Sequence, residues 1–337
     1  MENTTLNKAK KPSFGLHKLL ALSVLVILYV FFSIFGNNFL SWDTLINILN
    51  ASYYIGFMAI GVTFVIITGG IDLSLGTTLM TSALIGGAAY NMLGWSIAAS
   101  LVLTILTATA FGILNGVMVA YLKLPPFIAT LGSQMVGMGF GAIVTKVMTM
   151  RYPTVGTEDA WFKYVFYMTD PNSPIGRFPV GALWLLAAFL VASVLLNQTR
   201  FGRYTYAIGS NREAARLSGI KTRRWLALIY TLCGFFSGLA GIFFAAAYTT
   251  IIPGTGNGLE LLAIAGVVIG GTSMSGGVGS LTGTMIGVFV MSVLKQGLMS
   301  MGLQGHWQTF FTGIVVIGAV LLDNYRIAAA NRVKKPT

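Results

Sequence analysis

The chain has 337 residues, of which 55% are hydrophobic and 9% charged, and its mean hydropathy is +0.78. A water-soluble domain carries roughly a quarter charged residues. The 21 basic and 9 acidic residues are therefore too few to cover the surface of a soluble globule of 36.0 kDa, and the composition excludes one. It indicates a polytopic membrane protein, long enough for around ten helices of about 20 apolar residues each.

The amino-terminal segment 1–18 is basic and precedes the apolar run 19–35. That run is too long for the core of a signal peptide, and no small-residue cleavage site follows it. We expect an uncleaved first membrane helix, with residues 1–18 forming a cytoplasmic tail.

Apolar runs continue along the chain and predict an all-α protein with about ten membrane spans. The predicted transmembrane domain covers 19–322, with spans at 19–35, 51–68, 73–90, 95–121, 125–149, 180–196, 225–248, 260–273, 281–303 and 307–322. Ten spans place both termini on the same side. Most of the Lys and Arg residues then lie on that side, while Arg151, Lys163 and Arg177 lie opposite, so the positive-inside rule makes both termini cytoplasmic.

Two long connections and a tail complete this topology. Residues 150–179 form a proline-containing external loop, residues 197–224 a basic cytoplasmic loop, and residues 323–337 a cytoplasmic tail. The net charge of +12 is therefore attributed to the cytoplasmic excess of Lys and Arg and not to a nucleic-acid partner.

Glycine spacing predicts close helix packing. The pattern Gly-x-x-x-Gly occurs at 112/116, 137/141, 234/238, 266/270 and 283/287. In lipid, small residues let helix backbones approach each other closely, so these pairs favour a tight bundle. A chain with 41 glycines also produces single pairs of this kind by chance.

Two glycine-rich interruptions lie in similar settings, each after a span that runs inward. They indicate two pseudo-symmetric halves. Interrupted helices at matching places point to a transport pathway, because irregular backbone inside a membrane is tolerated where it is buried or lines a cavity. An ordinary tight turn between spans is the alternative. The candidate pathway residues are Gly69, Gly70, Asp72, Ser74, Gly270, Gly271, Thr272 and Ser273.

No pattern for catalysis, a cofactor or a metal is found. The single cysteine, Cys233, lies in an apolar run, and His17 and His306 share no ligand spacing. The phosphate-binding Gly-x-x-x-x-Gly-Lys-[Ser/Thr] motif is missing, so ATP hydrolysis by this chain is not expected. No intramembrane carboxylate or histidine suggests a proton relay, and Lys146 and Lys295 are expected to snorkel to an interface. Energy must come from a partner, or the solute moves downhill.

The basic loop contains a predicted short helix. Ser210-Asn211-Arg212-Glu213 matches a capping box, in which Ser210 caps the helix and Glu213 reaches back. Ala214, Ala215, Arg216 and Leu217 favour helix, and Gly219 after Ser218 suits a left-handed stop. Capping and charge fit two readings equally: a docking element, or a connector whose arginines face anionic lipid.

Several long motifs together resemble one family. These motifs are 69–74 (Gly-Gly-Ile-Asp-Leu-Ser), 126–131 (Pro-Phe-Ile-Ala-Thr-Leu), 199–220 (from Thr-Arg-Phe-Gly-Arg-Tyr to Leu-Ser-Gly-Ile), 260–265 (Glu-Leu-Leu-Ala-Ile-Ala) and 268–273 (Val-Ile-Gly-Gly-Thr-Ser). In order and spacing the chain resembles, from about Phe39 to Asp323, the permease subunits of bacterial ABC sugar importers of the ribose, galactose and xylose type. It departs from the family at Leu262, where an aspartate is usual, and at Ser210, where glycine is common.

The resemblance implies a permease in the bacterial cytoplasmic membrane that carries a monosaccharide or a sugar-like solute. It implies three partners: a cytoplasmic ABC ATPase, an extracytoplasmic sugar-binding protein, and a second copy or a paralogous permease. It also implies that 210–220 is the coupling helix that docks into the ATPase. The alternatives are a stand-alone facilitator or channel for a small polar solute, and an intramembrane enzyme, which would need acids or paired histidines inside the membrane.

Overall fold

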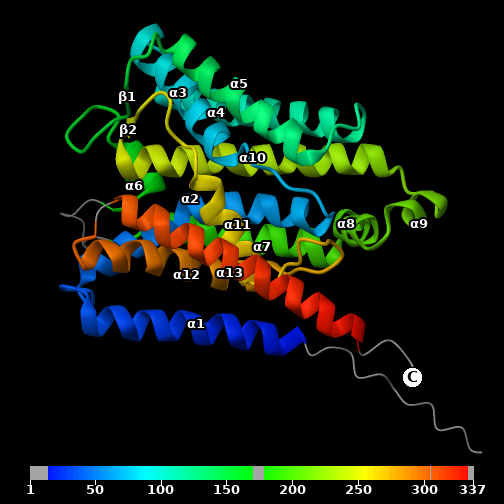
Figure 1. Ribbon diagram of the computed structural model, residues 1–337. Coiled ribbons are helices and arrows are strands. Elements are labelled where there is room, and N and C mark those ends of the chain that lie inside the picture. Colours follow the sequence, from blue (N-terminus) through cyan, green and yellow to red (C-terminus); the bar gives the residue numbers. More distant parts are fainter. Residues whose placement is uncertain (1–13, 170–177, 304, 333–337) are drawn as a thin grey trace, which may run out of the picture.

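The computed structural model describes residues 14–169, 178–303 and 305–332, and these are mostly helical (Figure 1). The tail residues 1–13 and 333–337 and the loop residues 170–177 lie outside the described part. The long helices are α1 (Phe14–Phe35), α2 (Trp42–Ile67), α3 (Leu75–Leu93), α4 (Ile97–Ala120), α5 (Pro126–Val144), α7 (Val180–Gln198), α10 (Thr222–Tyr248), α11 (Leu259–Ile269), α12 (Leu281–Ser300) and α13 (Gly305–Arg332).

The remaining elements lie at the two ends of the bundle. α8 (Arg200–Ser210) and α9 (Arg212–Leu217) lie at the end where α1 begins and α13 finishes (Figure 1). We name this the α9 end. β1 (Met150–Arg151), β2 (Thr250–Ile251) and α6 (Trp161–Phe166) lie at the opposite end, the β1 end. The gathering of both described chain ends beside the basic loop matches the predicted topology, and the direction of this bundle across a membrane stays a prediction.

Among the residues that the structure describes, six helices are long and apolar enough to cross a membrane: α2, α4, α5, α7, α10 and α12. Shorter apolar helical segments cover 19–35, 259–269 and 305–321. Every predicted span falls on a helix, so the prediction of a helical membrane protein is confirmed. The prediction of an all-α chain needs one correction, because β1 and β2 form a two-residue antiparallel ladder in which Met150 faces Ile251.

Several predicted boundaries are wrong for local reasons. The span 125–149 ends at Val144, because Lys146 and Val147 adopt left-handed backbone with φ 51° and 60°. Lys146 therefore lies in a turn after the helix. The span 260–273 ends at Ile269, where the glycine-rich segment starts. The last helix ends at Arg332, ten residues after the predicted 322. Asp323 therefore lies on this helix, where it contacts Ser273 of the glycine-rich segment.

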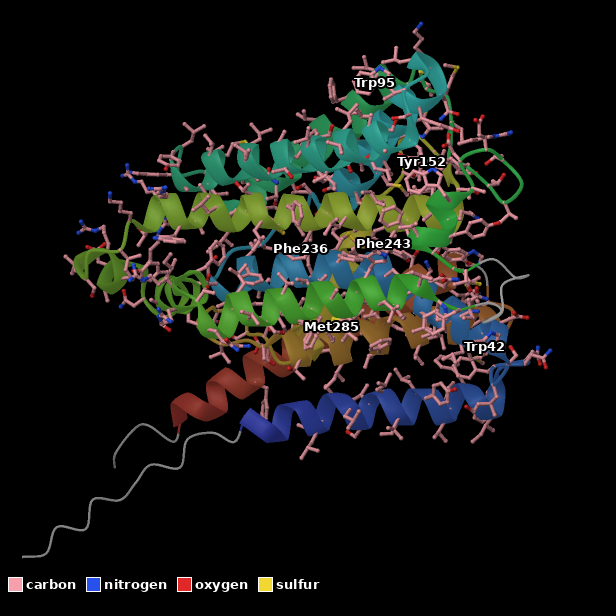
Figure 2. The ribbon with its side chains drawn as sticks, turned by 180° about the vertical axis from the view of Figure 1, so that it is seen from behind. Trp42, Trp95, Tyr152, Phe236, Phe243 and Met285 are labelled. Atoms are coloured by element: carbon pink, nitrogen blue, oxygen red, sulfur yellow. The ribbon has the colours of Figure 1, made fainter. Side chains whose placement is uncertain are left out.

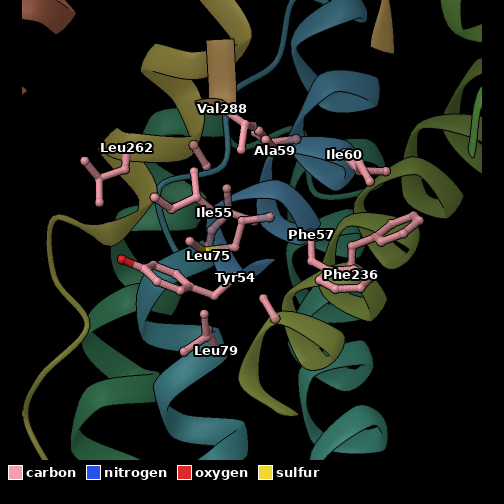
Figure 3. Close-up of a cluster of buried hydrophobic side chains, with 14 of the residues drawn as sticks. Tyr54, Ile55, Phe57, Ala59, Ile60, Leu75, Leu79, Phe236, Leu262 and Val288 are labelled. Carbon is pink, nitrogen blue, oxygen red and sulfur yellow. The ribbon is translucent and has the colours of Figure 1, made fainter. Parts of the chain in front are cut away.

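The core is organised around α2. Every residue from Asn50 to Ile67 is buried, so α2 is surrounded by protein along most of its length. Figure 3 shows its side chains among others of the buried cluster: Leu75 and Leu79 from α3, Phe236 from α10, Leu262 from α11 and Val288 from α12. Phe57 also stacks on Phe243, with ring centroids 4.5 Å apart.

Glycine pairs bring helix backbones together as predicted. A Cβ at Gly112 of α4 would lie 2.9 Å from the Cα of Gly234 on α10. Between α11 and α12, Gly266 faces Gly287, and a Cβ at Gly270 would overlap the backbone of Gly283. Four of the five Gly-x-x-x-Gly patterns therefore form two matched contacts, α4 with α10 and α11 with α12, which is the packing that small residues allow in lipid.

The outer surface of the bundle is apolar and has aromatic residues near one end. Trp42 and Trp95 are about half exposed and lie toward the β1 end, whereas Tyr152 at the same end is buried (Figure 2). Tryptophan and tyrosine concentrate at membrane–water interfaces, since their rings are apolar with one polar atom. Cys233 lies inside the bundle on α10 and is completely buried.

Candidate functional site

The short helix α9 is capped by Asn211. Its Oδ1 accepts a hydrogen bond from the backbone N–H of Ala214 at 2.9 Å, and its backbone is extended, as a cap requires. The predicted capping box is therefore wrong in register. Ser210 is the last residue of α8, so it has helical backbone and cannot cap α9. The acid Glu213 does not reach back toward Ser210 but pairs forward with Arg216.

α9 presents both charged and apolar side chains to its surroundings. Arg216 donates from Nη2 to Glu213 Oε1 at 2.6 Å and from Nε to Oε2 at 3.0 Å. This guanidinium lowers the pKa of the Glu213 carboxyl below its usual range. Leu217 is 73% exposed, whereas Ala215 is buried and anchors the helix. α9 ends at Leu217, and Gly219 follows it with the left-handed backbone that was predicted, φ 85°.

α8 connects α9 to the interior of the bundle. It begins at the cap Thr199, whose Oγ1 accepts a hydrogen bond from the Phe201 N–H at 3.1 Å. The Tyr206 hydroxyl donates to the carbonyl oxygen of Gly279 at 2.9 Å. A Cβ at Gly209 would overlap the carbonyl oxygen of Ile67, so only glycine lets α8 pack this closely against the end of α2.

The first glycine-rich segment, 68–74, turns back into the bundle and carries a buried polar cluster. Gly69 turns the chain with φ 75°. Asp72 is 2% exposed, and its Oδ1 accepts from the Ser74 N–H at 2.9 Å and from the Ser74 hydroxyl at 2.6 Å. Asn115 of α4 donates to Ser74 Oγ at 2.8 Å, and Tyr230 of α10 donates to the carbonyl oxygen of Ile71 at 3.2 Å. The sequence analysis singled out neither Asn115 nor Tyr230.

The second segment, 270–280, is held by the last helix. Gly271 has φ 92°, and Thr272 is completely buried. Asp323 on α13 accepts from the Ser273 hydroxyl at 3.2 Å and from the Met274 N–H at 3.1 Å. Gly270 packs on Gly283, so it serves helix contact as well as the turn.

The two glycine-rich segments meet each other at the end of α8. The Gly277 N–H donates to the carbonyl oxygen of Ile67 at 2.8 Å. A Cβ at Gly276 would lie 2.9 Å from both the Gly69 nitrogen and the Gly209 oxygen. We call this contact of Ile67, Gly69, Gly209, Gly276 and Gly277 the glycine junction. Three backbone segments that are far apart in the sequence touch there, and the Ser210 hydroxyl lies beside Gly277.

Two further charged residues lie inside the bundle. Glu260, at the start of α11, is 4% exposed, and its Oε1 accepts from the Gly258 N–H at 2.9 Å. Lys295 of α12 was expected to snorkel, and its ammonium donates to the Tyr54 hydroxyl at 2.7 Å and lies 5.3 Å from the centre of that ring. Within the described residues, no group of three His, Cys, Asp or Glu side chains could hold a metal ion.

A cavity of about 640 Å³ opens at the α9 end. Its wall includes Gly69 and Gly70 from the first segment, Lys123 from the α4–α5 loop, Arg212 and Arg216 from α9, and Arg223 from the start of α10. Two of the eight candidate pathway residues therefore line open space in this structure. Asp72, Ser74 and Thr272 are buried.

Comparison with known proteins identifies relatives along most of the chain. Residues 44–320 match the family model described as branched-chain amino acid transport system / permease component. The ribose import permease protein RbsC of Bacillus subtilis is 39% identical over 305 residues, covering 90% of this chain and 92% of the relative. The fructose import permease protein FrcC of Rhizobium meliloti is 33% identical, covering 90% and 84%. The autoinducer 2 permease LsrC of Yersinia pseudotuberculosis is 32% identical, covering 93% and 86%.

A solved structure supports the fold. A metal-chelate type ABC transporter in an inward-facing conformation aligns with a TM-score of 0.50, covering 94% of this chain and 99% of that one. The two sequences are 15% identical, so this likeness concerns the arrangement of the helices alone.

Proposed function

Because this chain belongs to the branched-chain amino acid transport system permease family, we propose that it forms the pathway for a monosaccharide or sugar-like solute. It is the membrane subunit of an ABC importer, and it resides in the bacterial cytoplasmic membrane. The sugar assignment rests on relatives named as ribose, fructose and autoinducer 2 permeases. ATP hydrolysis belongs to a separate subunit.

The proposed assembly contains a cytoplasmic ATPase, an extracytoplasmic sugar-binding protein and a second permease, either another copy or a paralogue. The observation that carries the ATPase contact is the surface of α9. Leu217 projects from this helix and is 73% exposed beside the Glu213–Arg216 pair. Protein contacts place an apolar centre within a polar rim, and Leu217 beside this charged pair has that arrangement. We assign Ser210–Gly219 to this contact, with α9 at its centre.

The glycine junction offers a route from the ATPase contact to the solute pathway. α9 follows α8 after the single residue Asn211. At Gly209, α8 touches the end of α2 and the second glycine-rich segment, whose Gly276 in turn lies against Gly69 of the first segment. Because protein interiors are close-packed, backbone segments in direct contact cannot move far without displacing one another. We therefore propose that displacement of α9 moves both segments together and opens or closes the pathway beside Asp72 and Ser74.

The ATPase contact is tested by changing Leu217 alone. We expect Leu217→Asp to abolish most co-purification of the ATPase with the tagged permease, since the change places a charge at an apolar contact. Leu217→Met keeps volume and polarity and is the matched control. Sugar uptake by reconstituted vesicles should fall with the first variant and stay normal with the second. Full co-purification of the Leu217→Asp protein with the ATPase would refute the assignment of α9.

The facilitator alternative makes a separate prediction. Vesicles that contain this chain alone, without ATP, ATPase or binding protein, would show robust sugar flux if the chain worked unaided. We expect flux only when the ATPase, the binding protein and ATP are all supplied.

A further inference from the structure

Two helices begin inside the bundle, and their first turns meet there. α11 has 11 residues and is about 16 Å long, roughly half of a hydrocarbon core, so it starts near mid-depth. α3 starts at Leu75, after segment 68–74 has turned back into the bundle. Leu75 and Leu262, from the first turns of α3 and α11, belong to one buried cluster (Figure 3).

The contact between the two first turns is close. A Cβ at Gly76 of α3 would lie 2.6 Å from Oε2 of Glu260 and would overlap the carbonyl oxygen of Gly256. Ser74 makes no side-chain hydrogen bond as the cap of α3, so the first N–H groups of that helix lack the partner that a cap supplies. The Glu260 carboxylate therefore lies at the end of α3 where the helix dipole favours negative charge.

Glu260 has one carboxylate oxygen to spare. The side chain is 4% exposed, and Oε1 is occupied by the Gly258 N–H. Among the residues that the structure describes, Oε2 has no hydrogen-bond partner. A buried polar atom without a partner costs free energy, and the large majority of such atoms in native proteins have one. A ligand that donates a hydrogen bond to Oε2 would remove that cost.

The chemistry at this place fits a neutral polyol. Oε2 of Glu260 can accept a hydrogen bond from one hydroxyl, while the N–H groups at the start of α3 can donate to the oxygen of the next. Adjacent hydroxyls on a sugar ring offer both a donor and an acceptor. A negatively charged solute would be repelled, because Asp72 is also close enough to Glu260 to interact with it electrostatically.

We propose that Glu260 and the first turn of α3 contact the solute as it passes, and that this solute is a neutral sugar with two adjacent hydroxyls. This rests on the proposed function and adds to it a residue that recognises the sugar inside the membrane. The candidate pathway residues Asp72 and Ser74 directly precede α3, so the contact lies on the same route.

A loop covers the site in this structure. Residues 252–258 lead into α11, and Asn257 is exposed whereas the glutamate behind it is buried. Gln134 of α5 donates from Nε2 to Asn257 Oδ1 at 3.0 Å and fastens the loop to that helix. Such a loop can act as a lid with glycine hinges. Its left-handed backbone positions are Gly254, Gly256 and Gly258.

The test uses proteoliposomes that contain the permease, its ATPase and its binding protein, with D-ribose as the probe. Uptake is measured with ATP and with saturating loaded binding protein, so the rate reports on the permease. Hydrogen bonds to charged groups are among the stronger ones, so Glu260→Gln should lower the rate about tenfold. Co-purification of the ATPase and the unfolding temperature in detergent should change little.

Monodeoxy riboses separate direct contact from a structural role. The wild type should lose about tenfold in rate on the analogue that lacks the recognised hydroxyl, whereas Glu260→Gln should lose little further on it. Such non-additivity is the signature of a direct interaction. Equal losses in both proteins on every analogue would mean that Glu260 acts on structure alone, and would overturn the proposal.

Glu158→Gln is the matched control. Glu158 is exposed in the loop after β1, so the same charge is lost away from the site, and uptake should stay at the wild-type rate. An equal fall with both variants would refute the contact, and so would normal uptake by Glu260→Gln. If the wild-type importer carries no D-ribose, the proposed function fails, and this contact fails with it.

Cysteines at positions 134 and 257 test the lid. A short bifunctional thiol reagent that joins them should stop uptake, and reductive cleavage of the reagent should restore it. Either single cysteine variant, treated in the same way, should keep its uptake, since the native Cys233 thiol is buried. Full uptake by the cross-linked protein would refute the assignment of the loop as a lid.

Discussion

The cap of α9 allows a sharp test of how local helix stability supports transport. Asn211→Ala removes the Oδ1 that accepts the Ala214 N–H at 2.9 Å, and it leaves the exposed α9 residues Glu213, Arg216 and Leu217 in place. Loss of an N-cap side chain destabilises a helix by about 1 kcal/mol. α9 has six residues and one buried side chain, Ala215, so tertiary packing compensates little for this loss.

A cost of about 1 kcal/mol lowers the ratio of folded to frayed α9 about fivefold. If the ATPase recognises the folded helix, its apparent affinity for the permease falls in proportion to the folded fraction of α9, by about fivefold at most. The assay is ATP-dependent sugar uptake by reconstituted vesicles at limiting ATPase. We expect the reduced uptake to recover when ATPase is added in excess, and we expect the unfolding temperature of the whole permease to change little.

Two variants decide whether the cap is responsible. Asn211→Ser restores a good capping side chain and should restore uptake. Ser210→Ala removes the residue that the capping-box motif designates, yet Ser210 belongs to α8, so uptake should stay near normal. The reasoning is refuted if serine at 211 is as damaging as alanine, or if Ser210→Ala causes the larger loss.

Three further changes test the packing around the site. Gly234→Ala places a methyl group 2.5 Å from a backbone oxygen of α4 and should destabilise the permease by about 1–3 kcal/mol, seen as a lower unfolding temperature in detergent; Gly132→Ala, with nothing within 4 Å, should leave it unchanged. Asn115→Ala removes the donor to Ser74 Oγ, and we expect a loss of about 1–3 kcal/mol in denaturant unfolding, together with slower uptake. Asp323→Ala leaves two donors of the second glycine-rich segment without an acceptor, so that segment should exchange its amide hydrogens faster.

Periodic and compositional signals predicted much of the fold. Long apolar runs located the helices, because a membrane helix must be apolar along its whole length. The Gly-x-x-x-Gly spacings fall in two close helix contacts, α4 with α10 and α11 with α12, since backbone approach in lipid requires small residues at that interval. β1 and β2 were missed because residues 150–151 and 250–251 pair across 100 positions, and two-residue strands have no local pattern.

The site was predicted less completely than the fold. The motif at 210–213 gave the right helix and the wrong cap, because the motif alone does not reveal that α8 continues through Ser210. Asn115 and Tyr230 are single polar residues within apolar runs, and their role depends on the folded position of segment 68–74. One signal in the sequence does indicate this cluster. An asparagine within an apolar span costs free energy unless its amide forms a hydrogen bond, so Asn115 requires a polar partner.

The burial of Cys233 makes this permease convenient for chemical labelling. The wild-type sequence has a single cysteine, and its thiol is completely enclosed. Maleimide reagents that do not cross membranes should therefore leave the wild-type permease in intact cells unlabelled. A cysteine introduced at an exposed position on α9 or on the 150–169 loop then becomes the one reactive group, and the side from which it is modified gives the direction of the chain across the bilayer without any change to the native thiol.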